Sequence, residues 1–454
     1  MKQREKFKRI INFLASGVII AVEVICFAYI WYAVYIDLLD KGDQFWRKGN
    51  WAVIGSYALI IFLLTKIMGG FKIGYLRITD VLLAQTIAII CSNIAIYFQL
   101  CIIFREYVSV TPLLEMTIVE FAFIIPWVFY GRFIFNKLYP PKQTIVVYGA
   151  YSPADLIKKI NSRKDKYDIC ASINISAGME RIKEEVNKYE AVVICDVPSG
   201  IRNLILKYCY SKSIRTYFTP KISDIMIQSG DSIHLFDTPL TLMRNYGLSF
   251  EQQAIKRLLD IIFAIIALIV FSPFMIISAI LIKLYDGGPV FYYQDRLTIS
   301  GKIFKIIKFR SMCVDSEKDG VRLAKKNDSR ITPVGKFLRN THFDEIPQIL
   351  NILKGDMSFV GPRPERPEIA SQYEKDIPEF EYRLKVKAGL TGYAQVYGKY
   401  NTTPYDKLKL DLTYITNYSV WLDLKLLVLT VKIVFQKESA EGVDANQTTA
   451  SKKK

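Results

Sequence analysis

The sequence predicts a membrane protein that combines a helical membrane region with α/β domains. The 454 residues are 51% hydrophobic with a positive mean hydropathy, which is too apolar for an ordinary soluble protein. Long apolar runs fill residues 10–130, whereas short β-branched runs alternate with polar helical stretches from Thr144 onward. A further apolar run, residues 258–282, is interrupted by Ser272 and Pro273.

Residues 1–142 are expected to form four transmembrane helices. The apolar runs cover residues 10–33, 51–65, 81–104 and 113–130. A span needs about 20 mostly apolar residues, so the second run is short, and Glu115 and Glu120 weaken the fourth. Basic residues precede the first run, lie between the second and third, and follow the fourth, which predicts that these segments share the cytoplasmic face. Glu23, inside the first run, fits either a structural role or a transport path.

Residues 143–250 are expected to form a degenerate Rossmann-like domain. Strands are predicted at 144–149, 167–175, 191–196 and 214–219, and helices lie between them. This alternation predicts a parallel, doubly wound sheet. A dinucleotide site needs Gly-x-Gly-x-x-Gly after the first strand, but the sequence offers only Gly149-Ala-Tyr-Ser-Pro153. A structural or regulatory role is therefore favoured over nucleotide binding.

The apolar run 258–282 is expected to dip into one leaflet and return. Length alone indicates a fifth crossing, and a proline-kinked crossing is the alternative. Lys256 and Arg257 precede the run and a strongly basic segment follows it, so both ends belong on the cytoplasmic face. Pro273 removes a helical hydrogen bond, and the Ser272 hydroxyl can satisfy a freed carbonyl. Ser272 and Pro273 therefore predict a membrane break within a re-entrant helix spanning 256–283.

The adjacent acids Asp344 and Glu345 are the strongest candidates for chemistry. They are expected to open a short helix that runs to about Lys354, ends at Gly355 and has Pro347 in its first turn. First-turn acids alone often only complement a helix dipole. Here four cations are candidates to surround a diphosphate with paired hydrogen bonds: Lys308, Arg310, Arg339 and Arg363. Near them Asp344 stays ionised, able to attack phosphorus or to hold Mg²⁺.

With these residues, the chain resembles bacterial polyprenyl-phosphate phosphoglycosyl transferases of the large type, which add N-terminal membrane and Rossmann-like regions. The resemblance covers residues 256–438 and rests on ordered motifs. They are Lys256-Arg-Leu-Leu-Asp260, Ser272-Pro273, Gly288-Pro-Val-Phe291, Gln294-x-Arg296, Lys308-Phe-Arg-Ser-Met312, Arg339-x4-Asp344-Glu345-x-Pro-Gln348, Lys354-Gly-Asp-Met-Ser358, Gly361-Pro-Arg-Pro364, Gly389-Leu-Thr-Gly392 and Ala394-Gln-Val396. The resemblance implies an α/β catalytic domain at 251–438, followed by a flexible tail at 439–454.

The resemblance also implies the reaction. Asp344 is the nucleophile and contacts Mg²⁺, Glu345 assists it, and Lys308, Arg339 and Arg363 bind phosphates. A sugar 1-phosphate passes from a UDP-sugar through an aspartyl intermediate to polyprenyl (undecaprenyl) phosphate, UMP leaves, and capsule, exopolysaccharide or O-antigen synthesis begins. The implied location is the bacterial plasma membrane, in contact with membrane lipids, with both α/β domains cytoplasmic. We expect no nucleic-acid partner, and a homo-oligomer is left open.

Two departures and two rival functions accompany this interpretation. Thr298 stands where the family commonly has glycine, and Tyr393 where tryptophan is frequent. The rivals are a membrane-anchored sensor or scaffold without catalysis and an enzyme that transfers the bare sugar. The net charge of +17 suits an anionic partner without choosing among lipid headgroups, nucleotide and nucleic acid. Seven cysteines without a Cys-x-x-Cys pair, and only two histidines, argue against a zinc or disulfide framework.

Overall fold

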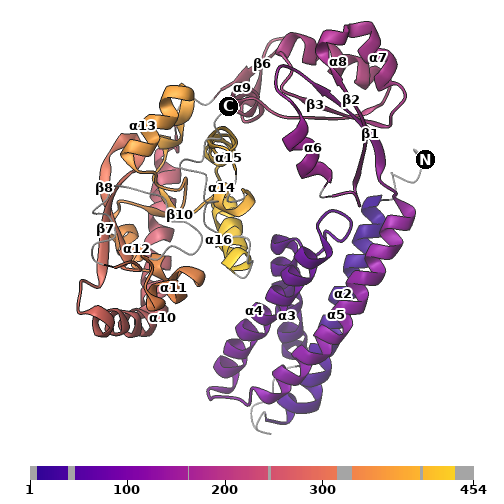
Figure 1. Cartoon of the computed structure of the whole chain (residues 1–454). Helices are drawn as coiled ribbons and strands as arrows, with labels where there is room; N and C mark the ends of the chain where they lie inside the picture. The colour runs from indigo at the N-terminus through magenta and orange to yellow at the C-terminus, as the bar shows by residue number, and fades with distance from the viewer. Residues whose placement is uncertain are drawn as a thin grey trace. The chain divides into compact units, whose positions relative to one another are not determined.

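The computed structural model describes residues 8–38, 47–161, 163–243, 247–313, 330–398 and 402–434. The chain divides into two compact units, residues 1–220 and 221–454 (Figure 1). This division precedes the domain boundary predicted at residue 250, because helix α9 (Ile222–Gln228) packs against α15 (Pro404–Thr416). The expected tail at 439–454 lies outside the described residues.

Four long helices form the first part of unit 1. They are α2 (Lys8–Ile30, extended by the short turns η1, Trp31–Tyr35, and η2, Ile36–Leu38), α3 (Arg47–Met68), α4 (Ile78–Phe104) and α5 (Thr111–Leu138). Each is long and apolar enough to cross a membrane. Glu120, which weakens the fourth apolar run, faces the bundle interior, where Tyr57 Oη donates to it at 2.6 Å and Asn93 Nδ2 at 3.1 Å. A polar group in an apolar layer is stabilised by such contacts between helices.

The second part of unit 1 is a four-stranded parallel sheet with strand order β2-β1-β3-β4. Its elements are β1 (Lys142–Tyr148), α6 (Ala154–Asn161), β2 (Tyr167–Asn174), η3 (Ile175–Ala177), α7 (Met179–Val186), β3 (Ala191–Cys195), α8 (Ser199–Ser211) and β4 (Arg215–Phe218). The chain moves outward from β1 to β2 and then crosses back to β3. Because such crossovers are right-handed, α6 covers one face of the sheet and α7 and α8 the other (Figure 1). The predicted parallel sheet is confirmed.

Gly149 lies at the point where a dinucleotide-binding fold would hold pyrophosphate. A Cβ atom at this position would lie 2.0 Å from the Asp196 backbone oxygen, and the Gly149 N–H donates to Cys195 O at 3.1 Å. The turn after β1 therefore packs directly on the turn after β3. Glycine is needed here for contact between two chain segments, and the structural or regulatory role expected of this domain stays a prediction.

A buried arginine joins the helices of unit 1 to its sheet region. Arg132, near the end of α5, donates to Ile73 O at 2.7 Å and pairs with Asp165, next to β2. Arg163 donates to the same carboxylate at 3.0 Å and to Tyr75 O at 2.8 Å. The loop between α3 and α4 and the end of α5 therefore lie at the same end of the bundle.

The described residues of unit 2 pack around one main hydrophobic core and form three two-stranded sheets, β5–β6 and β7–β8 antiparallel and β9–β10 parallel. Besides α9 and α15, its elements are β5 (Asp231–Leu235), β6 (Thr238–Leu242), α10 (Phe250–Asp286), β7 (Phe291–Leu297), η4 (Ile299–Gly301), β8 (Ile303–Phe309), α11 (Pro333–Asn340), η5 (Phe343–Glu345), α12 (Gln348–Lys354), β9 (Ser358–Val360), α13 (Pro367–Asp376), η6 (Pro378–Lys385), β10 (Gly389–Thr391), α14 (Tyr393–Tyr397) and α16 (Val420–Val434). The expected α/β character of this part is confirmed.

Helix α10 contains Ser272 and Pro273 within one continuous helical element. The missing Pro273 N–H leaves the Ile269 carbonyl without its usual helical donor, and Ser272 Oγ donates to this carbonyl at 2.9 Å. The hydroxyl therefore has the role predicted for it.

One face of α10 packs against the rest of unit 2 along nearly its whole length. Near its start, Lys256 Nζ pairs with Asp423 at 2.5 Å, and Asp260 accepts from Ser358 Oγ at 3.0 Å. Near its end, Ile282 is buried against Phe309 and Leu338. The opposite face exposes a row of large apolar side chains: Ile262, Ile265, Ile266, Ile269, Val270, Ile276, Ile277, Ile280 and Leu281.

Candidate active site

The acidic pair lies in a tight turn just before α12. Asp344 and Glu345 belong to the 3-10 turn η5, and α12 begins three residues later and ends at Gly355 with a φ of 98°. The predicted helix end at Gly355 is confirmed. The prediction that the acids open the same helix is wrong in detail, because Pro347 takes the position before the first residue of α12 and separates it from η5.

Glu345 is the acid that binds the nearby cations. Its Oε1 atom accepts from Lys308 Nζ at 2.7 Å and from Arg363 Nη2 at 2.9 Å. Lys308 comes from β8, and Arg363 comes from the loop after β9. Burial disfavours the charged carboxylate, but the charges of Arg363 and Lys308 and their hydrogen bonds outweigh it and hold the pKa of Glu345 well below its ordinary range.

Asp344 differs from its neighbour in both burial and partners. Its side chain belongs to a residue only 9% exposed, and among the described residues no hydrogen bond or ion pair engages its carboxylate. Burial raises its pKa, the Glu345 charge adds to this effect, and the charges of Lys308 and Arg339 oppose it. The pair thus combines a firmly ionised, paired acid with a buried acid whose oxygens are available for reaction.

The four predicted cations do not all lie in one cluster. Lys308 and Arg363 contact Glu345 directly, and Arg339, in the last turn of α11, acts on Asp344 through its charge. Arg310 instead pairs with Asp286 at the end of α10. Its guanidinium lies against Gly288, where a Cβ atom would come within 2.2 Å of Nη1. A phosphate-binding role for Arg310 stays a prediction.

The loop 361–366 holds Arg363 through its backbone. Four consecutive carbonyls accept hydrogen bonds from three parts of unit 2, namely β10, η6 and β7: Pro362 O from Gly389 N at 2.9 Å, Arg363 O from Arg383 Nη2 at 2.8 Å, Pro364 O from Arg296 Nη1 at 2.9 Å, and Glu365 O from Leu297 N at 3.0 Å. The conformation of the loop is therefore fixed next to the acidic pair.

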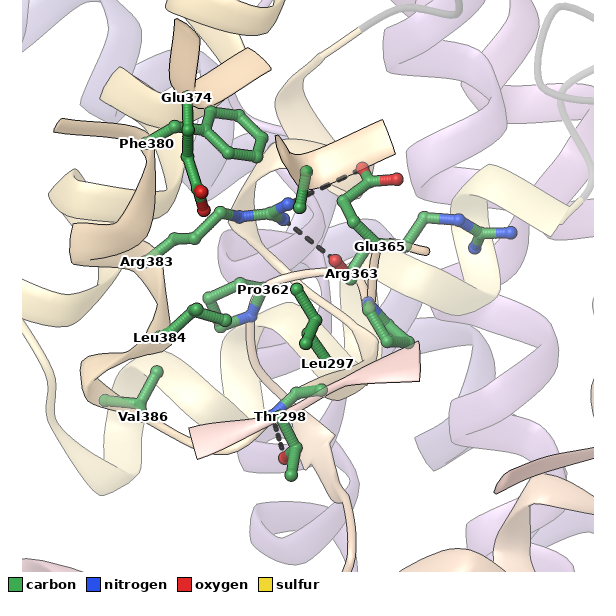
Figure 2. A pocket seen from close by; sticks show the side chains of 13 residues that line it. Leu297, Thr298, Pro362, Arg363, Glu365, Glu374, Phe380, Arg383, Leu384 and Val386 are labelled. Atoms are coloured by element: carbon green, nitrogen blue, oxygen red, sulfur yellow. Dashed lines mark hydrogen bonds and ion pairs between the residues drawn. The ribbon is translucent and has the colours of Figure 1, made fainter. Parts of the chain in front are cut away.

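Sequence reasoning missed a group of charged residues behind this loop. Arg383 is 3% exposed and lies between the carboxylate of Glu365 and the backbone oxygen of Arg363 (Figure 2). Asp411 and Lys407, one turn apart on α15, complete the group by pairing with Arg383 and Glu365 respectively. These residues are widely separated in sequence, and only the adjacency of Glu365 to Arg363 pointed to the site.

Glu365 is ionised within this group despite its burial. Burial alone would raise the pKa of its carboxyl, but the charges of Lys407 and Arg383 lower it to about 2. Burial also lowers the pKa of Arg296, to about 10, and the nearby Arg363 charge contributes. The region around the loop therefore contains many charged side chains, and the acids and cations among them pair with one another.

The two departures from the family pattern are accommodated without disturbing the site. Thr298 has an extended backbone (φ −129°), so glycine is not required, and its hydroxyl donates to Asp356 O at 2.8 Å. The same hydroxyl accepts from Ala388 N at 3.2 Å. Tyr393 packs on Tyr397 with ring centroids 4.5 Å apart.

The donor set near the acidic pair fits Mg²⁺ only if a substrate completes the site. Within the described ranges, no group of three or more histidine, cysteine or acidic side chains could hold a metal ion. Mg²⁺ is commonly bound through one or two carboxylates together with substrate phosphates. The unengaged Asp344 carboxylate suits that arrangement, whereas Glu345 is already paired with two cations.

Comparisons with known proteins identify the family of this chain. The family model described as "Bacterial sugar transferase" matches residues 251–437. The chain is 32% identical over 421 residues to the UDP-N-acetylgalactosamine-undecaprenyl-phosphate N-acetylgalactosaminephosphotransferase of Aeromonas hydrophila, covering 88% of this chain and 92% of the relative.

Two other relatives match a little over half of the chain. The UDP-glucose:undecaprenyl-phosphate glucose-1-phosphate transferase of Klebsiella pneumoniae is 38% identical over 58% of this chain and 56% of its own length. The undecaprenyl-phosphate galactose phosphotransferase of Salmonella typhimurium is 34% identical over 53% of this chain and 52% of its own length. With a relative matched over nearly its full length and the acidic pair and its cations brought together, this chain belongs to the bacterial sugar transferase family of polyprenyl-phosphate sugar-phosphate transferases.

Proposed function

We propose that this enzyme transfers a sugar 1-phosphate from a UDP-sugar to undecaprenyl phosphate and releases UMP, as the first membrane step of capsule, exopolysaccharide or O-antigen synthesis. The observation that carries the proposal is that the two acids of the pair differ in their contacts. Glu345 binds Lys308 and Arg363, while the Asp344 carboxylate lies beside them with no partner among the described side chains. The relatives are named for the same reaction with different sugars.

In the first step, an Asp344 oxygen attacks the phosphorus that bears the sugar. A bond forms between that oxygen and phosphorus, the bond from phosphorus to the bridging oxygen breaks, and UMP leaves with the electron pair. Lys308, Arg339 and Arg363 offset the charge spread over the phosphate oxygens. In the second step, a phosphate oxygen of the lipid attacks the same phosphorus, and the Asp344 carboxylate is released.

Glu345 fixes the geometry for both steps. Its paired carboxylate holds two cations from separate elements, β8 and the loop after β9, at one point beside Asp344. Pre-arranged charges of this kind stabilise a transition state without having to reorganise during the reaction. Asp344 and the substrate phosphates would hold Mg²⁺, which when bound neutralises part of the phosphate charge.

Metal removal tests this arrangement. Because the described residues do not form a metal site without substrate, we expect EDTA to abolish UMP release and to leave the thermal unfolding temperature of the donor-free enzyme unchanged. Added Mg²⁺ should restore turnover. Full activity in EDTA would remove Mg²⁺ from the mechanism, and a large drop in the unfolding temperature would reveal a structural metal.

The packing of α10 supports a helix that enters one leaflet and returns. Contacts with the rest of unit 2 recur from Lys256 to Ile282, about 39 Å of helix at 1.5 Å per residue. The hydrocarbon core is about 30 Å thick, so a helix crossing it could not stay packed on one polar domain over this length. We propose that the exposed apolar face of α10 lies in the cytoplasmic leaflet, and that the four helices of unit 1 cross the membrane with their basic ends in the cytoplasm.

Cysteine labelling tests the membrane topology. In a cysteine-depleted background, Glu251→Cys and Lys302→Cys should both react with an impermeant reagent from the cytoplasmic face, because both positions are exposed, Glu251 in the first turn of α10 and Lys302 beyond its end. Labelling of the two positions from opposite faces would show that α10 crosses the bilayer.

Nucleotide release from a panel of UDP-sugars, with undecaprenyl phosphate in nanodiscs, tests the reaction itself. UMP is the expected product. UDP would instead identify transfer of the bare sugar, and no turnover with any donor would favour a sensor or scaffold. Asp344→Asn should lower UMP release by roughly 10³-fold or more, because it removes the nucleophile. Glu368→Gln, an exposed first-turn acid of α13, is the matched control and should keep near-normal release.

A further inference from the structure

The charged group behind the loop 361–366 is a chain of four side chains with alternating charge. Lys407 pairs with Glu365, Glu365 with Arg383 at 3.5 Å, and Arg383 with Asp411 at 2.8 Å. The Arg383 and Asp411 side chains are 3% and 1% exposed. Buried ion pairs of this kind add little net stability compared with apolar packing, so their presence calls for another reason.

The Arg383 guanidinium is held in one orientation from several sides. Nε donates to Asp411 Oδ2 at 3.0 Å, and the Phe380 ring lies under the guanidinium at 4.9 Å. Nη2 is thereby directed at the backbone oxygen of Arg363, at 2.8 Å, while the Arg363 side chain extends away from Arg383 (Figure 2). A lysine could not make these contacts together, because it lacks the planar fork of donors.

Arg383 is distinct from the other groups that hold the loop. Backbone N–H groups of Gly389 and Leu297 hold Pro362 O and Glu365 O, as in ordinary strand pairing. Among the described side chains, Arg383 is the one that donates a hydrogen bond to the Arg363 carbonyl. The guanidinium of Arg363 in turn contacts Glu345 at 2.9 Å. A shift of this carbonyl would therefore move the Arg363 side chain relative to the acidic pair.

We propose that Arg383 is a positioning residue for phosphoryl transfer: fixed by Asp411 and Glu365, it holds the Arg363 backbone so that the Arg363 guanidinium meets Glu345 and the donor phosphates. This inference deepens the proposed function and rests on it. Displacement of a catalytic group by about 1 Å can lower a rate about 100-fold. In this proposal, the charged group behind the loop positions the Arg363 backbone and does not itself touch the reacting atoms.

Hydrogen exchange tests the structural part of this proposal without any turnover. In Arg383→Lys, we expect amides in peptides covering residues 361–366 to exchange about 10-fold faster or more than in the wild type, because the carbonyl of Arg363 loses its donor. The control Leu412→Ala removes a buried core side chain from α15, next to Asp411, and keeps the four donors that bind the loop carbonyls. It should destabilise unit 2 without selective exposure of the loop.

A double-mutant cycle in UMP release tests the functional part. Arg383→Lys alone should lower kcat/KM for the donor by roughly 10- to 100-fold. In an Arg363→Ala background the same substitution should have little further effect, because Arg383 acts through the Arg363 side chain and that side chain is already removed. Asp411→Asn, which leaves Arg383 in place but weakens its anchor, should show a smaller loss with the same dependence on Arg363.

Each result decides the proposal. Faster exchange confined to the loop, together with a loss that disappears in Arg363→Ala, would support it. Unchanged exchange, or losses that multiply independently in the double variant, would overturn it even if the wild type releases UMP. A wild type that releases no UMP from any donor would overturn the proposed function, and with it a role for Arg383 in catalysis, whatever the exchange data show about the loop.

Discussion

At the scale of single residues, the acidic pair separates two tasks that adjacent carboxylates could share. Glu345 forms two ion pairs, and Asp344 forms none among the described residues. One acid therefore organises the cations, and the other has the unengaged carboxylate that the proposed nucleophilic role requires.

The pairing of Glu345 makes stability depend on pH. Its pKa is lower in the folded protein than its ordinary value of 4.5, so its contribution is fully present above that pH and is lost as the pH falls below it. We expect Glu345→Gln to lower the free energy of unfolding at neutral pH by about 2 kcal/mol, because two cations lose a partner.

Chemical unfolding in nanodiscs at several pH values measures this effect. The wild type should lose stability more steeply than Glu345→Gln between about pH 5 and pH 3.5. Glu368→Gln, which removes an exposed acid, should follow the wild-type curve. Parallel curves for the wild type and Glu345→Gln would show that the ion pairs do not stabilise the fold.

At the scale of elements, α10 places the site at a surface. Its inner face belongs to the core of unit 2, where Ala264 is fully buried, and its outer face is apolar and exposed, with Ile269 69% exposed. A helix that is apolar on both sides suits the position proposed for α10, between a protein core and lipid. In that proposed position, a donor from the cytosol and an acceptor in the membrane would meet beside the same element.

The Ser272 and Pro273 pair gives a test at this scale. Ser272→Ala should lower the free energy of unfolding by about 1 kcal/mol, because the Ile269 carbonyl loses its donor within an apolar layer. In a Pro273→Ala background the loss should be smaller, since an alanine at this position supplies the missing N–H. Equal losses in both backgrounds, measured by thermal unfolding in nanodiscs, would contradict this account of the hydroxyl.

At the scale of the whole molecule, the proposed site residues and the four N-terminal helices belong to different units. Every residue assigned here to the reaction lies in unit 2, whereas unit 1 contains the four long helices and the parallel sheet. Within unit 1, the pairing of Arg132 and Arg163 with Asp165 ties the helices to the sheet region. Unit 1 thus has its own source of rigidity.

This division predicts separable effects. Asp165→Asn should destabilise unit 1 by about 2 kcal/mol, because it leaves the buried Arg132 without its acid. UMP release should stay within about two-fold of the wild type, because the acidic pair is untouched. Peptide-resolved hydrogen exchange and the release assay measure the two effects. A large loss of turnover with an intact unit 2 would show that unit 1 takes part in catalysis.

Much of this organisation is readable from the sequence. Apolar runs and alternating β-branched segments locate the long helices and the parallel sheet, because hydrophobic period and length act locally. The ends of helices are local too, as Gly355 shows by ending α12 with a positive φ. Motif order places Asp344 and Glu345 among cations, although it groups Arg310 with residues that it does not contact.

Only the tertiary structure decides which charges meet. Arg383 binds the backbone of Arg363, and Lys407 and Asp411 come from a separate helix, so no local pattern could have joined them. The sequence by itself determined the elements and the types of chemical group, because those depend on neighbours along the chain. Tertiary packing determined the partner of each acid, because an ion pair depends on distance in space, and folding sets that distance between residues remote in sequence.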